Sequence, residues 1–176
     1  LIETGFVPGI KKVGDLFGSG RLFLPELVMS APAMEQVTGL LNESIPGGQG
    51  QTHGRVVIAT VEGDVHDIGK TIVVSLLKAN GFAVLDLGRD VAVAKLIEEA
   101  DKFNANIIGT SALLTTTMGA QKELEEELIK AGLKDRFKTM VGGAPVTQRW
   151  ADRIGADAYA QDAGDGVRKV KQLLNA

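Results

Sequence analysis

The chain has 176 residues, of which 44% are hydrophobic and 23% charged, and its formal net charge is −3 at pH 7. This length holds one full domain with a smaller appendage, and the composition is that of an ordinary globular protein. The slight negative charge argues against a nucleic-acid-binding surface as the main function. The sequence has no cysteine, which excludes disulfides and thiolate metal sites.

We find no signal peptide and no apolar run long enough to cross a membrane, so we expect a cytoplasmic protein without a membrane partner. Because the first residue is Leu1 instead of Met, we also expect the chain to be part of a longer one.

The first 45 residues have the apolar spacing of helices. One helix is predicted over 7–17, ending at the Gly-Ser-Gly of 18–20, and a second is predicted to begin near Pro25. Two such helices cannot bury their apolar faces alone. We therefore predict a helical cap over 1–45, a Gly-rich linker over 46–53 and a second domain over 54–176.

From residue 54 onward, apolar strand patterns alternate with helix patterns. This alternation predicts an α/β fold, a flavodoxin-like doubly wound sheet of five parallel strands in the order 2-1-3-4-5. The predicted strands are 55–61, 82–87, 106–110, 138–142 and 157–160. The predicted helices are 68–80, 92–102, 117–131, 147–153 and 164–174.

The loop between the first strand and the first helix of this sheet carries the most informative residues. They are Gly63, Asp64, Val65, His66, Asp67, Ile68 and Gly69. Open α/β sheets bind their ligands at the carboxyl ends of the strands, where this loop is expected. Asp64 can accept a hydrogen bond from one ring nitrogen of His66 and leave the other nitrogen free to coordinate a metal. Alternatively, the Asp caps the helix and the His is solvated.

The pattern Asp64-x-His66-x-x-Gly69 resembles the signature of cobalamin-binding domains, in which the histidine is the lower ligand of cobalt. In that family the pattern is followed by Ser-x-Leu and then by a Gly-Gly pair. Here residues 70–110 precede Ser111-Ala112-Leu113, and residues 114–141 precede Gly142-Gly143. Both spacings, 41 and 28 residues, are those of the family.

The resemblance implies a set of residues that contact cobalamin or a related corrinoid, with His66 bound to cobalt. Besides residues 63–69, the implied set is Ser111, Leu113, Thr115, Thr117, Gly142, Gly143 and Ala163. It also implies a relay of His66, Asp64 and Thr117 that links protonation to the oxidation state of cobalt. The hydroxyl-rich loop before the third helix could also cap that helix.

The segment 14–26 resembles the cap of methionine synthase and of the small corrinoid proteins of methyltransferase systems. That family's cap is a four-helix bundle, and residues 1–45 match its second half. By this resemblance, Phe17 and Leu24 cover the methyl-bearing face of the corrin, and Glu3 matches a cap glutamate near the cofactor.

The function implied is that of a corrinoid protein carrying a methyl group as methylcobalamin. Its implied partners are a substrate-specific methyltransferase, a second methyltransferase with tetrahydrofolate or a thiol as acceptor, and a reductive activase. Such a carrier is not a complete enzyme alone. The alternatives are the cobalamin-binding subunit of an adenosylcobalamin-dependent mutase and a cobalamin-dependent sensor. Residues 1–45 disfavour the first, because mutase domains lack the cap.

Overall fold

The computed structural model describes residues 52–175 and scattered positions of the N-terminal segment. Those positions are Gly9, Lys12, Val13, Leu16, residues 19–23, Glu26 and Met29. Most of the predicted cap and linker, with Glu3, Phe17 and Leu24, lies outside the described residues. The described residues thus cover nearly all of the second predicted domain.

Strands and helices alternate along residues 55–174. The strands are β1 (Arg55–Thr60), β2 (Ala83–Asp86), β3 (Ile107–Ser111), β4 (Lys138–Gly142) and β5 (Ala158–Ala160). The helices are α3 (Ile68–Ala79), α4 (Val93–Lys102), α5 (Gly119–Lys130), α6 (Gln148–Ile154) and α7 (Ala163–Leu174). All ten predicted elements are confirmed, with ends that differ by at most two residues.

The five strands form one parallel sheet in the order β2-β1-β3-β4-β5, which confirms the predicted flavodoxin-like fold. β1 lies between β2 and β3, with Val57 opposite Leu85 on one side and Ile108 on the other. The next strand along the chain, β2, lies on one side of β1, and all later strands lie on its other side. The loops that follow β1 and β3 therefore meet at the switch point where such sheets bind ligands.

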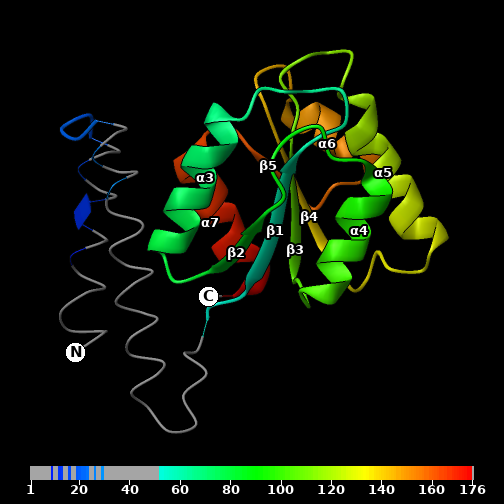
Figure 1. The fold of residues 1–176 in the computed structure, drawn as a ribbon, viewed down its shortest axis with the longest axis horizontal. Coiled ribbons are helices and arrows are strands. Elements are labelled where there is room, and N and C mark those ends of the chain that lie inside the picture. Colours follow the sequence, from blue (N-terminus) through cyan, green and yellow to red (C-terminus); the bar gives the residue numbers. More distant parts are fainter. Residues whose placement is uncertain are drawn as a thin grey trace, which may run out of the picture.

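Helices cover both faces of the sheet, α3 and α7 on one and α4 and α5 on the other (Figure 1). A first buried cluster joins α3, α7 and one face of the strands, with Leu77, Ile107 and Val170 fully buried. A second joins the other face to α4 and α5, with Ile108 and Leu128 fully buried. The strands are apolar on both faces, as a sheet between two helical layers requires.

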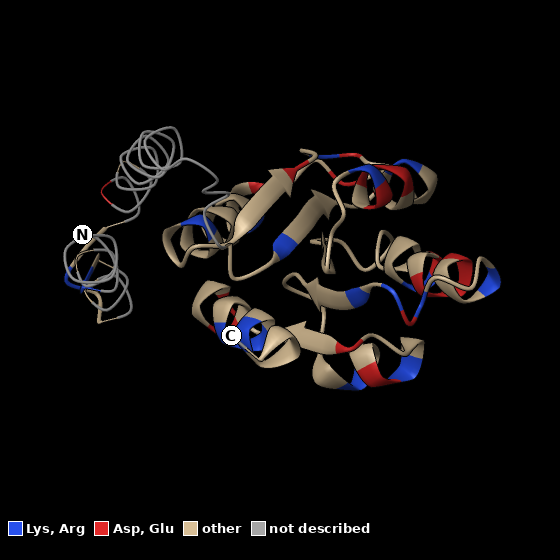
Figure 2. Cartoon of the chain, turned by 90° about the horizontal axis from the view of Figure 1, so that it is seen from below, with Lys and Arg blue, Asp and Glu red and all other residues tan. Residues whose placement is uncertain are grey.

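Charged side chains lie mainly on the outer faces of the helices, away from the sheet (Figure 2). The apolar residues face inward, so the helices show the two-sided pattern expected of a doubly covered sheet. Among the described residues, no helix is long and apolar enough to span a bilayer.

Candidate functional site

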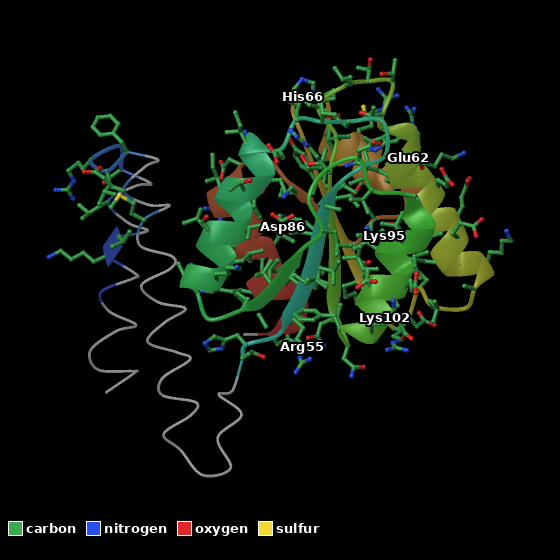
Figure 3. The ribbon with its side chains drawn as sticks, viewed as in Figure 1. Arg55, Glu62, His66, Asp86, Lys95 and Lys102 are labelled. Atoms are coloured by element: carbon green, nitrogen blue, oxygen red, sulfur yellow. The ribbon has the colours of Figure 1, made fainter. Side chains whose placement is uncertain are left out.

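A cavity of about 800 Å³ opens at the carboxyl edge of the sheet, on the side covered by α3 and α7. His66 lies at this edge and Arg55 lies at the opposite end of the sheet (Figure 3). The cavity volume is in the range of sites that bury a cofactor-sized ligand.

His66 lies in the loop between β1 and α3, and its side chain is 49% exposed. Its Nδ1 lies 2.8 Å from Asp64 Oδ1. Because Asp64 is a carboxylate, this contact places the ring hydrogen on Nδ1 and leaves Nε2 with its lone pair. The His66 carbonyl accepts a hydrogen bond from the buried Thr60 hydroxyl at 3.2 Å, which fixes the backbone as well.

Asp64 is fully buried, and hydrogen-bond donors surround both of its oxygens. Oδ1 accepts from the backbone N–H of His66 at 3.1 Å in addition to the ring contact. Oδ2 accepts from the backbone N–H groups of Leu113 and Leu114, at 2.7 and 3.2 Å, and from the Thr117 hydroxyl at 2.8 Å. The structure thus brings together the predicted trio of His66, Asp64 and Thr117.

These donors decide the charge of Asp64. Burial alone would raise the pKa of this carboxyl group, because an ion in a low-dielectric environment loses its hydration. The backbone N–H groups of His66 and Leu113, the imidazole and the Thr117 hydroxyl outweigh burial and hold the pKa well below its usual range. Asp64 is therefore ionised at neutral pH.

A tight turn precedes the histidine. Asp64 N–H donates to the Val61 carbonyl at 3.1 Å, and Gly63 has a φ of 77°, a left-handed conformation in which glycine is favoured. The N-cap of α3 is Asp67, which makes no side-chain capping bond. The alternative in which an Asp of this loop caps the helix with its side chain is therefore wrong, both for Asp67 and for Asp64, which bonds elsewhere.

Ten of the predicted site residues line the cavity. They are Val65, His66, Asp67, Ile68, Gly69, Ser111, Leu113, Gly142, Gly143 and Ala163. Gly63, Asp64 and Thr117 do not line it, but Asp64 is bonded to His66 and Leu113, which do. Thr115 is exposed and does not line the cavity, although the resemblance includes it among the residues that contact the corrinoid.

The loop before α5 does not cap that helix. The N-cap is Met118, which makes no side-chain capping bond, and α5 begins at Gly119, two residues later than predicted. Thr117 instead closes a turn through its N–H to the Leu114 carbonyl, at 3.1 Å, and directs its hydroxyl to Asp64. The predicted capping role for these hydroxyls is therefore wrong.

Gly142 ends β4 and Gly143 follows it, and the packing of the backbone requires a glycine at Gly143. A Cβ on Gly143, whose φ is 127°, would lie 1.8 Å from the Ala112 carbonyl oxygen. A Cβ on Gly142 would lie 3.4 Å from the Ala160 carbonyl oxygen, which is an ordinary contact distance. Gly143 therefore lets the chain after β4 lie close to the end of β3, at the wall of the cavity.

Several lining residues were not predicted. Ile58, Ile72, Val73, Met140, Tyr159 and Ala160 line the cavity. The sequence marks most of them only as apolar strand or helix positions, because it does not show which face of each element the ligand meets. Lys70 was also missed; its buried ammonium pairs with Asp86, and it too lines the cavity.

A corrin fits this arrangement. It supplies the in-plane ligands of its metal, so one protein nitrogen suffices, and His66 offers Nε2 with its lone pair. The wall beside it is built from small residues, Gly142, Gly143, Ala144, Ala160 and Ala163, which leave room for a flat group. Gly69 has no atom within 4 Å of an added Cβ, so the loop is open at the start of α3.

The fold and site define a flavodoxin-like domain with a cavity at the switch point and a histidine among the residues that line it. Residues 54–170 match the family described as B12 binding domain, and residues 1–42 match a second family with the same description. The chain therefore belongs to the B12-binding protein family and binds a corrinoid cofactor.

The relatives are corrinoid proteins. The chain is 49% identical to "Trimethylamine corrinoid protein 2" of Methanosarcina mazei, over 99% of this chain and 81% of that protein. It is 50% identical to "Dimethylamine corrinoid protein 2" of the same organism, over 99% of this chain and 82% of that protein. Among solved structures, the methanol:cobalamin methyltransferase complex MtaBC from Methanosarcina barkeri matches with a TM-score of 0.90 and 36% identity, over 100% of this chain and 67% of that one.

Proposed function

We propose that the chain carries a methyl group on its corrinoid between two methyltransferases, the first of which is specific for a methylated amine. The observation that supports this most is the buried Asp64 that holds His66 at the cavity, in a chain close to corrinoid proteins named for trimethylamine and dimethylamine. The methanol complex is the more distant relative, at 36% identity.

In this proposal His66 Nε2 would hold the cobalt of the corrinoid, and Asp64 fixes the ring by holding the Nδ1 hydrogen. When bound, the corrinoid would supply the cobalt chemistry of methyl transfer. Leu113 and Leu114 donate to the same carboxylate, so the position of the ring depends on the loop after β3 as well as on its own loop.

We propose the same residues, His66, Asp64 and Thr117, as a relay between protonation and the state of the cofactor. Its central contact is the one between His66 Nδ1 and Asp64 Oδ1. Asp64 is suited to this role because its donors keep it ionised. Thr117 contributes by donating to Oδ2, on the far side of the carboxylate from the histidine.

The partners we propose are a substrate-specific methyltransferase, a second methyltransferase that uses tetrahydrofolate or a thiol, and a reductive activase. We propose residues 1–45 as the cap, with Phe17 and Leu24 over the upper face of the corrin. The alternatives are the subunit of an adenosylcobalamin-dependent mutase and a cobalamin-dependent sensor. Each would work with a different cofactor or partner from those of a methyl carrier.

The test is methyl transfer in a reconstituted system. The protein is loaded with cobalamin, reduced, and mixed in turn with trimethylamine, dimethylamine, monomethylamine or methanol and the methyltransferase specific for each. We expect the visible spectrum of methylcobalamin to form with at least one methylamine system. If no donor methylates the protein while the MtaBC complex, the matched positive control, is methylated with methanol, the carrier proposal is wrong.

A further inference from the structure

The loop between β2 and α4 is bonded along the end of β1. Leu87 N–H donates to the Ile58 carbonyl at 3.0 Å, and Thr60 N–H donates to the Gly88 carbonyl at 2.9 Å. Val91 N–H then donates to the Thr60 carbonyl at 3.2 Å. The loop therefore continues the parallel pairing past the end of β2, and lies beside the turn that leads to His66.

Asp90 makes two contacts with that turn from this loop. Its backbone N–H donates to the Asp64 carbonyl at 3.0 Å. Its side-chain Oδ1 accepts from the Gly63 N–H at 2.8 Å. Glu62 and His66, at the two ends of the turn region, both lie toward this edge of the sheet (Figure 3). Asp90 thus holds the two residues that come just before Val65 and His66.

Asp64 is consequently held from two sides. The loop after β3 donates to its carboxylate, and Asp90 on the loop after β2 bonds to its backbone. We propose that Asp90 is a positioning residue for His66, one that sets the orientation of the Asp64 carboxylate and through it the ring. This inference rests on the proposed role of His66 as the cobalt ligand.

The backbone of Asp90 supports this role. Its φ is 56°, a left-handed conformation that is unfavourable for residues with a Cβ and persists where the surroundings require it. Glycine would adopt it without strain, but glycine has no carboxylate for Gly63. Asn and Asp combine tolerance of this conformation with a side-chain acceptor. This combination predicts which substitutions preserve the site.

Three variants separate the side chain from the backbone. Asp90→Gly keeps the left-handed conformation and removes the acceptor, whereas Asp90→Asn keeps both. Asn104→Gly is the matched control, because Asn104 also has a left-handed φ, of 52°, and precedes β3 at the other end of the sheet. If Asp90→Gly does not fold, Asp90→Ala removes the same acceptor while keeping a Cβ.

The first measurement uses cofactor-free protein and follows amide hydrogen exchange of Gly63 and His66 by NMR. In Asp90→Gly we expect both amides to exchange at least about 3-fold faster. The Gly63 N–H loses its acceptor on Asp90, and the Asp64 acceptor of the His66 N–H is no longer held in its orientation. Asp90→Asn and Asn104→Gly should match the wild type at both amides. Unchanged exchange of the His66 amide in Asp90→Gly would show that Asp90 does not orient Asp64.

The second measurement uses protein saturated with cob(II)alamin and follows axial nitrogen coupling by electron paramagnetic resonance. We expect the ratio of histidine-coordinated to uncoordinated cobalt to fall about 3- to 10-fold in Asp90→Gly and to be restored in Asp90→Asn. A lower melting temperature with an unchanged ratio would contradict the inference. If the wild type itself lacks histidine nitrogen coupling, the proposed ligand role fails first, so the two failures are distinguishable.

Discussion

Two buried carboxylates lie at opposite ends of the sheet, and their environments differ. Asp64, at the carboxyl edge, accepts three backbone N–H bonds and contacts from an imidazole and a hydroxyl. Glu125, on α5, is 1% exposed; its Oε2 lies 2.6 Å from Lys134 Nζ, and its Oε1 has no hydrogen-bond partner within the described structure. Lys134 also bonds to Asp157, at 2.8 Å.

The pKa shifts of the two groups have opposite signs. Burial raises the pKa of Glu125, and the contact with Lys134 only partly offsets it, whereas the donors around Asp64 overcome burial and lower the pKa of that group. A full set of fixed donors stabilises a buried carboxylate more than one ion pair does. Asp64, whose two oxygens both accept hydrogen bonds, lies next to the histidine. Glu125, one of whose oxygens has no partner, does not line the cavity.

The largest effect is expected from Asp64→Asn, which replaces a charged acceptor with an amide whose NH₂ group meets donors. We expect corrinoid affinity or histidine coordination to fall about 10- to 100-fold, and cofactor-free protein to lose about 2–4 kcal/mol in urea unfolding. Asp135→Asn, at an exposed loop position, is the control and should change neither. Equal cofactor spectra in Asp64→Asn and wild type would contradict the role given to this carboxylate.

A smaller effect is expected from Thr117→Val, which keeps the shape of the side chain and removes one of the donors to Asp64. Leu113 and Leu114 still donate, so the loss in unfolding free energy should be about 1 kcal/mol. Thr117→Ser keeps the hydroxyl and should restore most of it. Urea unfolding of the cofactor-free variants measures both, and an identical midpoint for valine and threonine would show that the third donor is unimportant.

The effect expected from Glu125→Gln is similar in size to that of Thr117→Val, and it depends on pH. Because the folded state raises the pKa of Glu125, it binds the proton more tightly than the unfolded state does. Wild-type stability is therefore lost as pH rises from the unfolded pKa, about 4.3, through the folded pKa. We expect Glu125→Gln to gain stability relative to wild type, by about 1 kcal/mol, between pH 4 and pH 8.

The neighbouring Glu126 provides the control for that pH series. Glu126 is exposed and pairs with Lys122 at 2.9 Å across one helical turn. Glu126→Gln should stay within about 0.5 kcal/mol of wild type at every pH. A Glu125→Gln curve that runs parallel to wild type from pH 4 to pH 8 would mean that burial does not disfavour the charge of Glu125.

The sequence predicted the sheet and the ligand loop because both depend on local patterns. The apolar runs and the Gly-rich breaks determine β1, α3 and the loop that holds His66. Contacts between residues on different strand-to-helix loops could not be predicted from local patterns. Leu113 and Leu114 lie 49 and 50 residues from Asp64, and only the adjacency of β1 and β3 brings their N–H groups to its carboxylate.

Asp90 shows the same limit. In the sequence, Gly88-Arg89-Asp90 indicates only a loop, since Gly and Asp are common wherever a chain turns. Its contacts with Gly63 and Asp64 follow from the position of β2 beside β1 and from a backbone angle that no residue pattern specifies. Thr60 is likewise one of several β-branched strand residues until its hydroxyl is seen at the His66 carbonyl.

The most direct test of the account is isotopic labelling of histidine in protein loaded with cob(II)alamin. The account predicts that axial nitrogen splitting in the electron paramagnetic resonance spectrum changes from the nitrogen-14 to the nitrogen-15 pattern when the protein is made with nitrogen-15 histidine. The splitting should be absent in His66→Ala, and present in His53→Ala, the only other histidine of the chain. A splitting that is unchanged by the label would show that the cofactor keeps its own base and that His66 is not the ligand.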